Sequence, residues 1–194
     1  MTGSLGFLGQ YVVRELTEQG FDVLGYDIKN GPDYDITRCD LEILKTVDVV
    51  VHLAAYVGLV KAARNPPESA FTTCYGTERL LDGCVRFGVK RFILASTWAV
   101  NGLGINPYDY GKRYCESAVK SAYKLRGLDY TILRFGTAYG PGMRDEGVIQ
   151  NFIKKAKAGE KLVIHGRGEQ NRQFTSAFDI ARGDRDWETY NPSL

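Results

Sequence analysis

Three short, largely apolar runs, at 47–55, 90–96 and 128–136, limit the folds that this chain can adopt. Such runs are typical of strands buried on both faces, which occur in parallel sheets covered by helices. Segments with the apolar spacing of helices, 69–88 and 112–127, separate these runs from one another. The alternation predicts an α/β fold, a doubly wound parallel sheet of the Rossmann type with helices on both faces.

The start of the chain predicts a phosphate-binding turn between a strand and a helix. Glycines stand at every third position, as Gly3, Gly6 and Gly9, and the segment 11–20 that follows has the apolar spacing of a helix. The first glycine permits a tight bend, the second lets a pyrophosphate approach the backbone, and the third lets the helix pack closely. Glycine-rich turns also occur without a ligand, so other residues must decide between the two uses.

Asp27 favours the ligand-binding use. It ends the segment 21–27, which we expect to be the second strand. It lies roughly 20 residues beyond the glycines, where dinucleotide-binding folds place an acid on the adenosine ribose. A carboxylate there repels the additional phosphate of NADP, so the sequence favours NAD. The alternative is that Asp27 only caps a turn formed with Asn30 and Gly31.

Charge and cysteine content exclude several classes of function. The chain of 194 residues has 25 Lys and Arg against 23 Asp and Glu, a net charge of +2 without a basic block, so neither nucleic acid nor a membrane is an expected partner. The four cysteines form no CxxC pair and the two histidines stand alone, so we expect no metal site and free thiols in a reducing compartment. No signal peptide precedes the glycines, and no apolar run reaches the roughly 20 residues that span a bilayer, which predicts a cytoplasmic protein.

Tyr108 and Lys112 are candidates for proton transfer. They stand four residues apart at the start of an expected helix, so their side chains share one face. An ammonium beside a phenol favours the phenolate, which can take a proton from a sugar hydroxyl near neutral pH. Tyrosine and lysine at this spacing are also common as solvated surface pairs. Tyr110 has no lysine four residues on and is not a candidate.

Ser96 and Thr97 follow the expected strand 90–96 at its carboxyl end, where open parallel sheets bind ligands. A hydroxyl there can bind the substrate oxygen and pass its proton to Tyr108. The glycine turn, the acid, these hydroxyls and the Tyr–Lys pair occur in the order expected for one dinucleotide-dependent site. This order favours an active site over a surface pair.

The assembled motifs resemble those of the extended short-chain dehydrogenase/reductase family, in its NAD-dependent sugar-nucleotide epimerase/dehydratase branch, which includes UDP-glucose 4-epimerase. The resemblance runs from Thr2 to about Gly183. It rests on TGSLGFLG, HLAA, YGTERLL, FILAST, YDYGK and RFGTAYGPG, and on EQNRQF followed by Asp179. It implies hydride transfer on tightly held NAD.

The resemblance also implies a role for individual residues. It assigns to NAD the residues Gly3, Gly6, Phe7, Leu8, Gly9, Asp27, Asp35, Ile36, Leu53, Ala54, Ala55, Tyr108 and Lys112, with Asp35 and Ile36 lining the adenine pocket. It assigns to catalysis Thr97, Tyr108 as general base, and Lys112. It assigns to a nucleotide-sugar substrate Thr97, Thr137, Val148, Phe152 and Arg172, with Arg172 on the diphosphate and Val148 and Phe152 near the base.

The residues after Thr97 favour epimerisation within this branch. Dehydratases that resemble the family carry Asp-Glu after this threonine, and the decarboxylating branch carries a glutamate there, whereas this chain has Trp98 and Ala99. Epimerisation needs oxidation, re-presentation of the ketone and reduction by the same cofactor, for which Thr97, Tyr108 and Lys112 suffice. Thr137 stands where asparagine is usual at a position that often contacts the substrate phosphate, so the sugar nucleotide stays open.

The pattern changes after Gly140, where 141–170 predicts a glycine-rich loop, a basic amphipathic helix and a short strand. We therefore expect a NAD-binding domain with the catalytic residues at 1–140 and a small, incomplete substrate-binding lobe at 141–194. The segments before the glycines, around 104–106 and after Arg182 are short for the family. We expect residues to be absent at these three places.

Two other functions stay open at this point. One is an NAD-linked dehydrogenase or reductase of the same fold that releases its reduced cofactor, and the other is a non-catalytic dinucleotide-sensing protein. A homodimer through the helices after YGT and YDYGK is also possible. Those helices carry Leu80, Leu81, Cys84, Ala118 and Ala122, which could equally pack against the chain's own sheet.

Overall fold

The computed structural model describes residues 1–102, 105–143, 147–164, 166–169, 171–183 and 188–190. Its helices are α1 (Phe7–Glu18), α2 (Leu59–Arg64), α3 (Pro66–Ala70), α4 (Gly76–Phe87), α5 (Pro107–Arg126), α6 (Val148–Lys157) and α7 (Ala177–Arg182). Its strands are β1 (Val49–His52), β2 (Arg91–Thr97), β3 (Asp129–Phe135), β4 (Thr137–Tyr139), β5 (Phe174–Ser176) and β6 (Glu188–Tyr190). Shorter helical turns are η1 (Ile28–Asn30), η2 (Pro32–Tyr34), η3 (Leu41–Thr46), the π turn η4 (Phe71–Tyr75) and η5 (Trp98–Asn101).

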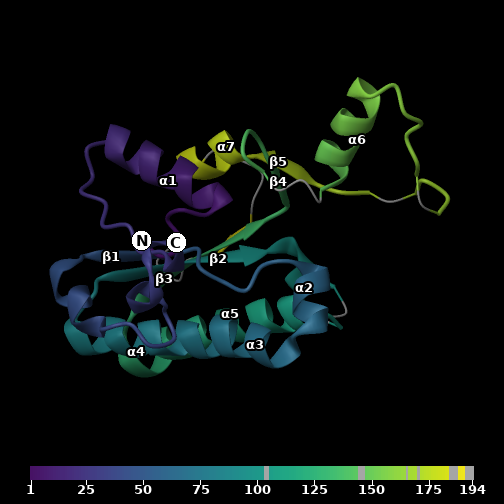
Figure 1. The fold of residues 1–194 in the computed structure, drawn as a ribbon. Coiled ribbons are helices and arrows are strands. Elements are labelled where there is room, and N and C mark those ends of the chain that lie inside the picture. Colours follow the sequence, from purple (N-terminus) through teal and green to yellow (C-terminus); the bar gives the residue numbers. More distant parts are fainter. Residues whose placement is uncertain (103–104, 144–146, 165, 170, 184–187, 191–194) are drawn as a thin grey trace.

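The main sheet has the order β1-β2-β3-β6. The pairs β1–β2 and β2–β3 are parallel, and β3–β6 is antiparallel. Helices α1 and α7 cover one face of the sheet, and the layer of α2 to α5 covers the other (Figure 1). The predicted α/β fold, with a parallel sheet between two helix layers, is thereby confirmed.

Thr2 occupies the position of a central strand next to β1. Its N–H donates to Val51 O at 2.9 Å and its carbonyl accepts from Leu53 N at 3.2 Å. On the other side, Gly3 N donates to Tyr26 O at 2.8 Å. Thr2 thus forms a parallel bridge to each neighbour, with its own N–H and carbonyl bonded on the β1 side and with Met1 O and Gly3 N bonded to Tyr26. This arrangement brings the glycine turn directly to the carboxyl end of β1.

The core lies between the sheet and the layer of α4 and α5. Phe92, Leu94 and Ile132 from the strands are fully buried there. Four of the five helix residues named for a homodimer, Leu80, Leu81, Cys84 and Ala122, belong to this buried core, and Ala118 packs against it. They pack against the chain's own sheet, which was the alternative to a homodimer interface.

Several predicted elements differ from the structure. The segment 21–27 is not a strand but forms one bridge at Tyr26, because Phe21 and Leu24 are 59% and 44% exposed and no sheet face covers them. The predicted helix 69–88 is divided into α3, η4 and α4. Residues 161–164 form no strand, and β6 arises in a tail without a periodic pattern.

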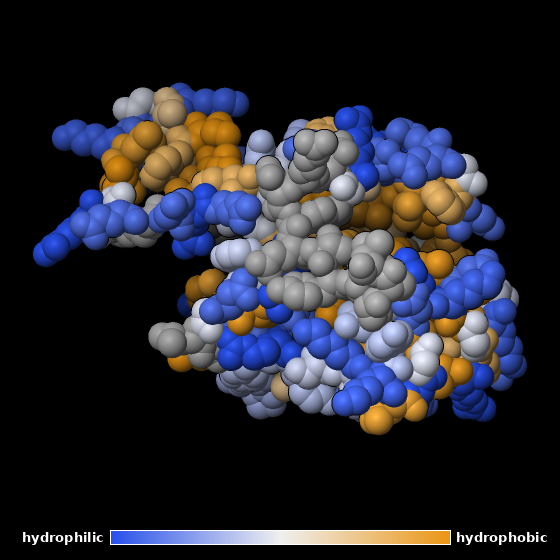
Figure 2. Space-filling model, turned by 180° about the vertical axis from the view of Figure 1, so that it is seen from behind, coloured by the Kyte–Doolittle hydropathy of each residue, from blue (hydrophilic) through white to orange (hydrophobic). Residues whose placement is uncertain are grey.

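A second, smaller sheet joins the body of the molecule to a projecting lobe. Strands β4 and β5 pair in parallel, and α6 lies beyond them, away from the main sheet (Figure 1). Helix α7 returns to the body, where the Phe178 ring packs on the Tyr11 ring of α1 at 4.8 Å. Figure 2 shows apolar side chains gathered on the projecting lobe.

Candidate active site

The glycine turn is packed so closely that side chains are excluded from it. A Cβ on Gly9 would lie 2.0 Å from Gly3 O, and a Cβ on Gly3 would lie 2.8 Å from Ala54 N. Gly3 also has a φ of 70°, which favours glycine. The turn therefore rests on Leu53 and Ala54 at the end of β1, as the motif predicts for a strand–turn–helix unit.

The start of α1 is open to an anion. Gly6 is the residue before the helix and supplies no side-chain cap, so the first-turn amides of Phe7, Leu8 and Gly9 have no capping acceptor from it. These amides and the positive end of the helix dipole suit a phosphate. A cradle that only glycine fits, below an uncapped helix start, suits the pyrophosphate of a dinucleotide.

Asp27 fastens this turn to the neighbouring chain segment. Its buried carboxylate accepts hydrogen bonds from Leu5 N at 2.9 Å and from Lys29 N at 3.0 Å, and so caps η1. Asp27 therefore caps the turn η1, as the alternative interpretation of this residue predicted. Each carboxylate oxygen can accept a second hydrogen bond, so this use leaves acceptor capacity for ribose hydroxyls.

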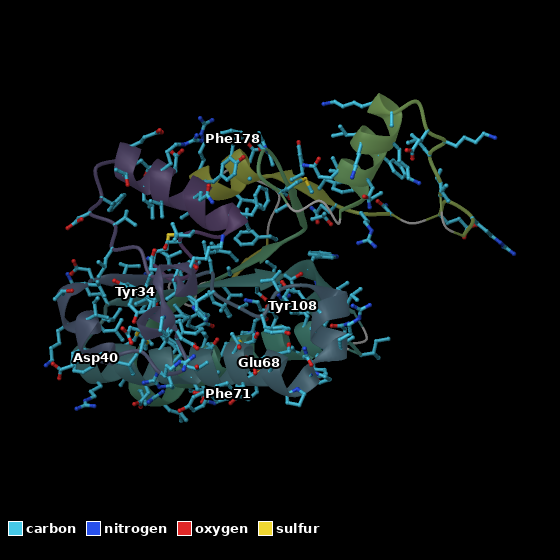
Figure 3. The ribbon with its side chains drawn as sticks, in the orientation of Figure 1. Tyr34, Asp40, Glu68, Phe71, Tyr108 and Phe178 are labelled. Carbon is cyan, nitrogen blue, oxygen red and sulfur yellow. The ribbon has the colours of Figure 1, made fainter. Side chains whose placement is uncertain are left out.

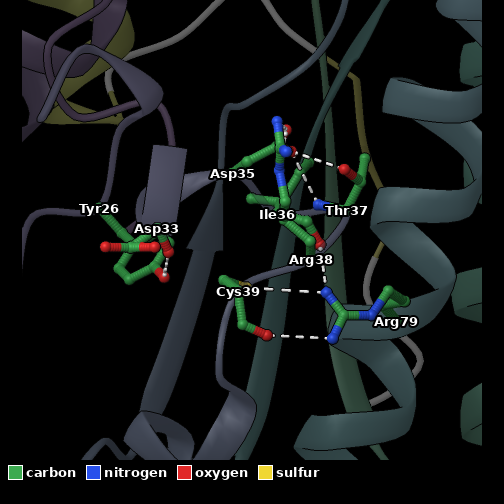
Figure 4. Close-up of polar contacts among 8 residues, drawn as sticks. All are labelled: Tyr26, Asp33, Asp35, Ile36, Thr37, Arg38, Cys39 and Arg79. Atoms are coloured by element: carbon green, nitrogen blue, oxygen red, sulfur yellow. Dashed lines mark hydrogen bonds and ion pairs between the residues drawn. The ribbon is translucent and has the colours of Figure 1, made fainter. Parts of the chain in front are cut away.

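The loop that begins at Asp35 is held by its own side chains and by α4 (Figure 4). The Asp35 carboxylate accepts from the backbone N–H and the hydroxyl of Thr37, and pairs with Arg38. Burial alone would raise the pKa of Asp35, but these contacts outweigh it and lower that pKa. Arg79 donates to Ile36 O at 3.1 Å, and the Ile36 side chain is buried in the core.

His52 connects the glycine turn to α4, a role that the sequence did not indicate. Thr77 donates to Thr73 O at 2.6 Å, so its oxygen accepts from His52 Nε2 at 2.9 Å. The other ring nitrogen, Nδ1, then accepts the Thr2 hydroxyl proton at 2.7 Å. Burial, with help from the Lys112 ammonium, lowers the pKa of His52 to about 3, so the ring is neutral.

Thr97, Tyr108 and Lys112 lie around the carboxyl end of β2. Thr97 is the last residue of that strand, and its oxygen accepts from Ala99 N at 3.2 Å, which leaves its hydroxyl proton for another acceptor. Tyr108 is half-buried in the first turn of α5, beside α2 (Figure 3). Lys112 is 3% exposed and donates to Ala95 O at 2.8 Å.

The environment of Lys112 combines burial with nearby negative groups. Burial lowers the pKa of Lys112, while Cys115, Cys74 and Glu116 act in the opposite direction. A buried ammonium one helical turn from Tyr108 is not the solvated surface pair of the alternative interpretation. The structure thus places Lys112 inside the molecule, on the helix face that it shares with Tyr108.

Ser96 has a different partner from the one expected. It is buried and donates to Glu116 Oε1 at 2.6 Å, and Glu116 forms an ion pair with Arg134. Arg134 in turn donates to Asn101 Oδ1 at 3.0 Å, in the turn that follows Thr97. Ser96 therefore supports the sheet end, and Thr97 is the hydroxyl left for a ligand. Glu116 and Arg134 are 18 residues apart, which is why no local motif revealed the pair.

Four of the predicted substrate residues line one pocket of about 910 Å³ in the lobe. Thr137, Val148, Phe152 and Arg172 all contribute to its wall. The same wall includes Asn151 and Lys155 of α6, together with the extended segment at 163–164. Among the described residues that line it, none is Thr97, Tyr108 or Lys112, so the pocket is separate from these three predicted catalytic residues.

A model of the NAD dependent epimerase/dehydratase family matches residues 1–183, which include the glycine turn, the predicted catalytic residues Thr97, Tyr108 and Lys112, and the pocket wall. The chain belongs to this family.

Known proteins of the epimerase/dehydratase type differ in the reaction that they catalyse. This chain is 31% identical to a UDP-glucuronate 4-epimerase of Thermodesulfobacterium geofontis, over 94% of this chain and 69% of that protein. It is also 31% identical to a UDP-N-acetyl-alpha-D-glucosaminuronate decarboxylase of Bacillus cytotoxicus, over 92% and 67%. Its structure resembles that of MoeE5 in complex with UDP-glucose and NAD, with a TM-score of 0.84 and 32% identity over 93% of this chain and 68% of that one.

These comparisons establish the class of the chain and its cofactor. It is an enzyme of the NAD-dependent sugar-nucleotide epimerase/dehydratase family, and the cofactor of that family is NAD. Within the described part of the chain, no group of three His, Cys, Asp or Glu residues could hold a metal ion. No helix among the described residues is long and apolar enough to cross a membrane.

Proposed function

We propose that this chain is an NAD-dependent nucleotide-sugar epimerase. The observation that carries the proposal is the turn after Thr97. Trp98 and Ala99 occupy η5, and neither can act as the acid or base that removal of water or of a carboxyl group requires. The adjacent side chains that can move a proton are the Thr97 hydroxyl and the Tyr108 phenol, and epimerisation needs no further acid or base.

The chain's own residues have distinct parts in this reaction. Tyr108 takes the proton from the sugar hydroxyl and later returns it, and Thr97 donates a hydrogen bond to the same oxygen. Lys112 stabilises the phenolate of Tyr108 by its positive charge and holds the nicotinamide ribose. The amides of the glycine turn hold the pyrophosphate, and Asp27 holds the adenosine ribose. When bound, NAD would supply reversible hydride transfer at the carbon that carries this hydroxyl.

The substrate half of the proposal rests on the pocket of the lobe. The Arg172 guanidinium can pair with two oxygens of a diphosphate group at once, and Lys155 adds a second positive charge to the same wall. Val148 and Phe152 provide apolar surface for the nucleotide base. Thr137 also lines this pocket. It begins β4, two residues after the end of β3 in the main sheet. The comparison proteins bind UDP-sugars, which supports this class of substrate.

An NAD-linked dehydrogenase is the second candidate, since it would use the same three residues and the same cofactor. The dinucleotide sensor is disfavoured by the burial of Lys112 beside Tyr108, which costs stability without a chemical use. A homodimer stays a prediction. Phe71 (labelled in Figure 3) and Tyr75 are 50% and 46% exposed and their rings stack, so they provide apolar surface for it. The cytoplasmic location also stays a prediction.

The test is incubation of the purified protein with NAD and a panel of UDP-, GDP- and dTDP-sugars. The sugar nucleotides are then resolved by chromatography while the absorbance of NADH is recorded. We expect one substrate to yield a stereoisomer without accumulation of NADH, whereas stoichiometric NADH would assign a dehydrogenase. If no sugar nucleotide changes although NAD binds, the result favours the dinucleotide-sensing protein over the epimerase.

Two tyrosine variants serve as a matched pair in this assay. Tyr108→Phe removes the proton-transfer group, and we expect a loss of about 10²-fold or more in turnover. Tyr110→Phe removes the hydroxyl of a tyrosine that is 43% exposed two residues along the same helix, and turnover should be unchanged. Equal activity of both variants would exclude Tyr108 as the acid/base.

A further inference from the structure

Two cysteines from neighbouring helical segments meet next to Lys112. Cys74 is in η4 and Cys115 is in α5, and their thiols form a hydrogen bond with each other. Cys115 Sγ also lies 3.3 Å from Thr77 Oγ1 and 3.4 Å from Thr73 O. Cys74 Sγ lies 3.9 Å from Gly111 O, so the sulfur reaches the turn of α5 that carries Lys112.

The two thiols differ in acidity, because their pKa values are shifted in opposite directions. The hydrogen bond from Cys74 and the Lys112 ammonium lower the pKa of Cys115 to about 7, against the effect of burial. The same hydrogen bond and burial raise the pKa of Cys74. Near neutral pH, a substantial fraction of the pair therefore has a thiolate on Cys115, three residues from Lys112.

The other two cysteines differ from this pair. Cys84 is fully buried in the core, and burial raises its pKa to about 12. Cys39 is also buried, and its sulfur lies 4.0 Å from Arg79. Cys74 is partly exposed, whereas the other three cysteines are buried, so a solute can reach Cys74 first.

We propose that Cys74 and Cys115 form a reversible oxidation site, at which a disulfide between η4 and α5 lowers the activity of the enzyme through Lys112. This inference rests on the proposed function for its effect on turnover. The bond joins two segments that are already in contact, since Cys115 Sγ lies 3.4 Å from Thr73 O, the carbonyl that precedes Cys74. It also removes the thiolate that partners the buried ammonium, so that Lys112 loses a negative neighbour.

The oxidant is a low-molecular-weight disulfide such as oxidised glutathione. Cys74 attacks one sulfur of the oxidant while its proton passes along the hydrogen bond to the Cys115 thiolate, which forms a mixed disulfide and releases one glutathione thiolate. That glutathione thiolate then takes the proton from Cys115. The Cys115 thiolate then attacks the Cys74 sulfur and releases the second glutathione. Each cysteine thus gives up one proton and one electron, and the two electrons reduce the glutathione disulfide to two thiols.

The test treats the purified, NAD-loaded enzyme with oxidised glutathione, blocks the remaining thiols and identifies cross-linked peptides by mass spectrometry. We expect one disulfide, between Cys74 and Cys115, a mass lower by two hydrogen atoms, and full reversal by dithiothreitol. The NAD dissociation constant should rise, and turnover should fall by up to about a hundredfold, the cost of a displacement of about 1 Å at a reacting group. Cys74→Ser should resist the oxidant, whereas Cys84→Ala should respond as the wild type does.

Several results would overturn the proposal. One is that Cys74 and Cys115 stay reduced, and another is that the disulfide forms elsewhere. A third is that the expected disulfide forms but leaves both NAD affinity and turnover unchanged. Failure of the proposed function is a separate result, because the peptide map and the NAD affinity are measured without any sugar substrate.

Discussion

Lys112 shows how a single residue can be costly to the fold and useful to the site. An ammonium that is 3% exposed loses most of its hydration, and its single described hydrogen bond is to Ala95 O. The nearby Cys115 and Glu116 offset part of that loss by their negative charge. A position of this kind is retained where the charge is needed for chemistry, which agrees with its place one turn from Tyr108.

His52 predicts a loss of stability in mild acid. In the unfolded chain this histidine binds a proton below its ordinary pKa of 6.5, but in the folded protein only near pH 3. Between these values the unfolded state binds more protons, so the free energy of unfolding falls as the pH falls, by about 2 kcal/mol from pH 7 to pH 5. Urea denaturation at both pH values measures this difference.

The control for this measurement is His52→Gln. Glutamine can donate to Thr77 as the ring does, but it does not titrate. We expect the variant to be less stable by about 1–3 kcal/mol at pH 7, because the Thr2 hydroxyl loses its acceptor, and to show little further loss at pH 5. If wild type and variant lose stability in parallel between these pH values, His52 is not the group responsible.

At the scale of the element, the position of α1 depends on contact between backbones. Gly9 lies in this helix against Gly3 O, and the approach is possible because no Cβ intervenes. The same helix is held from its other side by the Tyr11 hydroxyl, which donates to Pro141 O at 2.7 Å. The start of α1 is thus fixed over the end of the sheet, where its amides can meet a phosphate.

Gly9→Ala and Gly111→Ala place the same substitution in two helices with opposite expected effects. In α1 the new Cβ collides with backbone, so stability should fall by about 1–3 kcal/mol and NAD should bind about tenfold more weakly or worse. In α5 the new Cβ meets its nearest neighbours, Thr73 Cγ2 and Cys74 Sγ, at 3.6 and 3.8 Å, which is ordinary van der Waals contact, so stability should rise by up to about 1 kcal/mol. Urea midpoints and NAD titrations measure both, and an unaltered Gly9→Ala protein would refute the close packing.

At the scale of the whole molecule, the sequence predicted the interior better than the edges. In the apolar runs that became β1, β2 and β3, one face is buried and most residues of the other face are partly buried, so their pattern had one interpretation. The segment 21–27 has strand-like composition, but Phe21 and Leu24 face solvent. Strand β6 depends on pairing with β3, a partner more than fifty residues away, and no local pattern encodes such a contact.

For the candidate site, the sequence indicated the residues that belong to local motifs. The glycine turn, Asp27, Thr97, Tyr108 and Lys112 were named because each belongs to a short motif with a chemical reason for its spacing, and their roles stay predictions. The links from His52 to Thr2 and Thr77, and from Glu116 to Arg134, join residues 18 to 50 positions apart. Contacts of this length appear only once the strands and helices are packed.

The most direct test of the whole account uses a nucleotide sugar that has deuterium on the carbon whose hydroxyl is inverted. An epimerase returns the hydride to the carbon from which it came, so we predict that the epimerised product retains the deuterium on that carbon. No deuterium should appear in released NADH, and the Tyr108→Phe variant should form no labelled product. Loss of the label to solvent, or its recovery in free NADH, would contradict the proposed reaction.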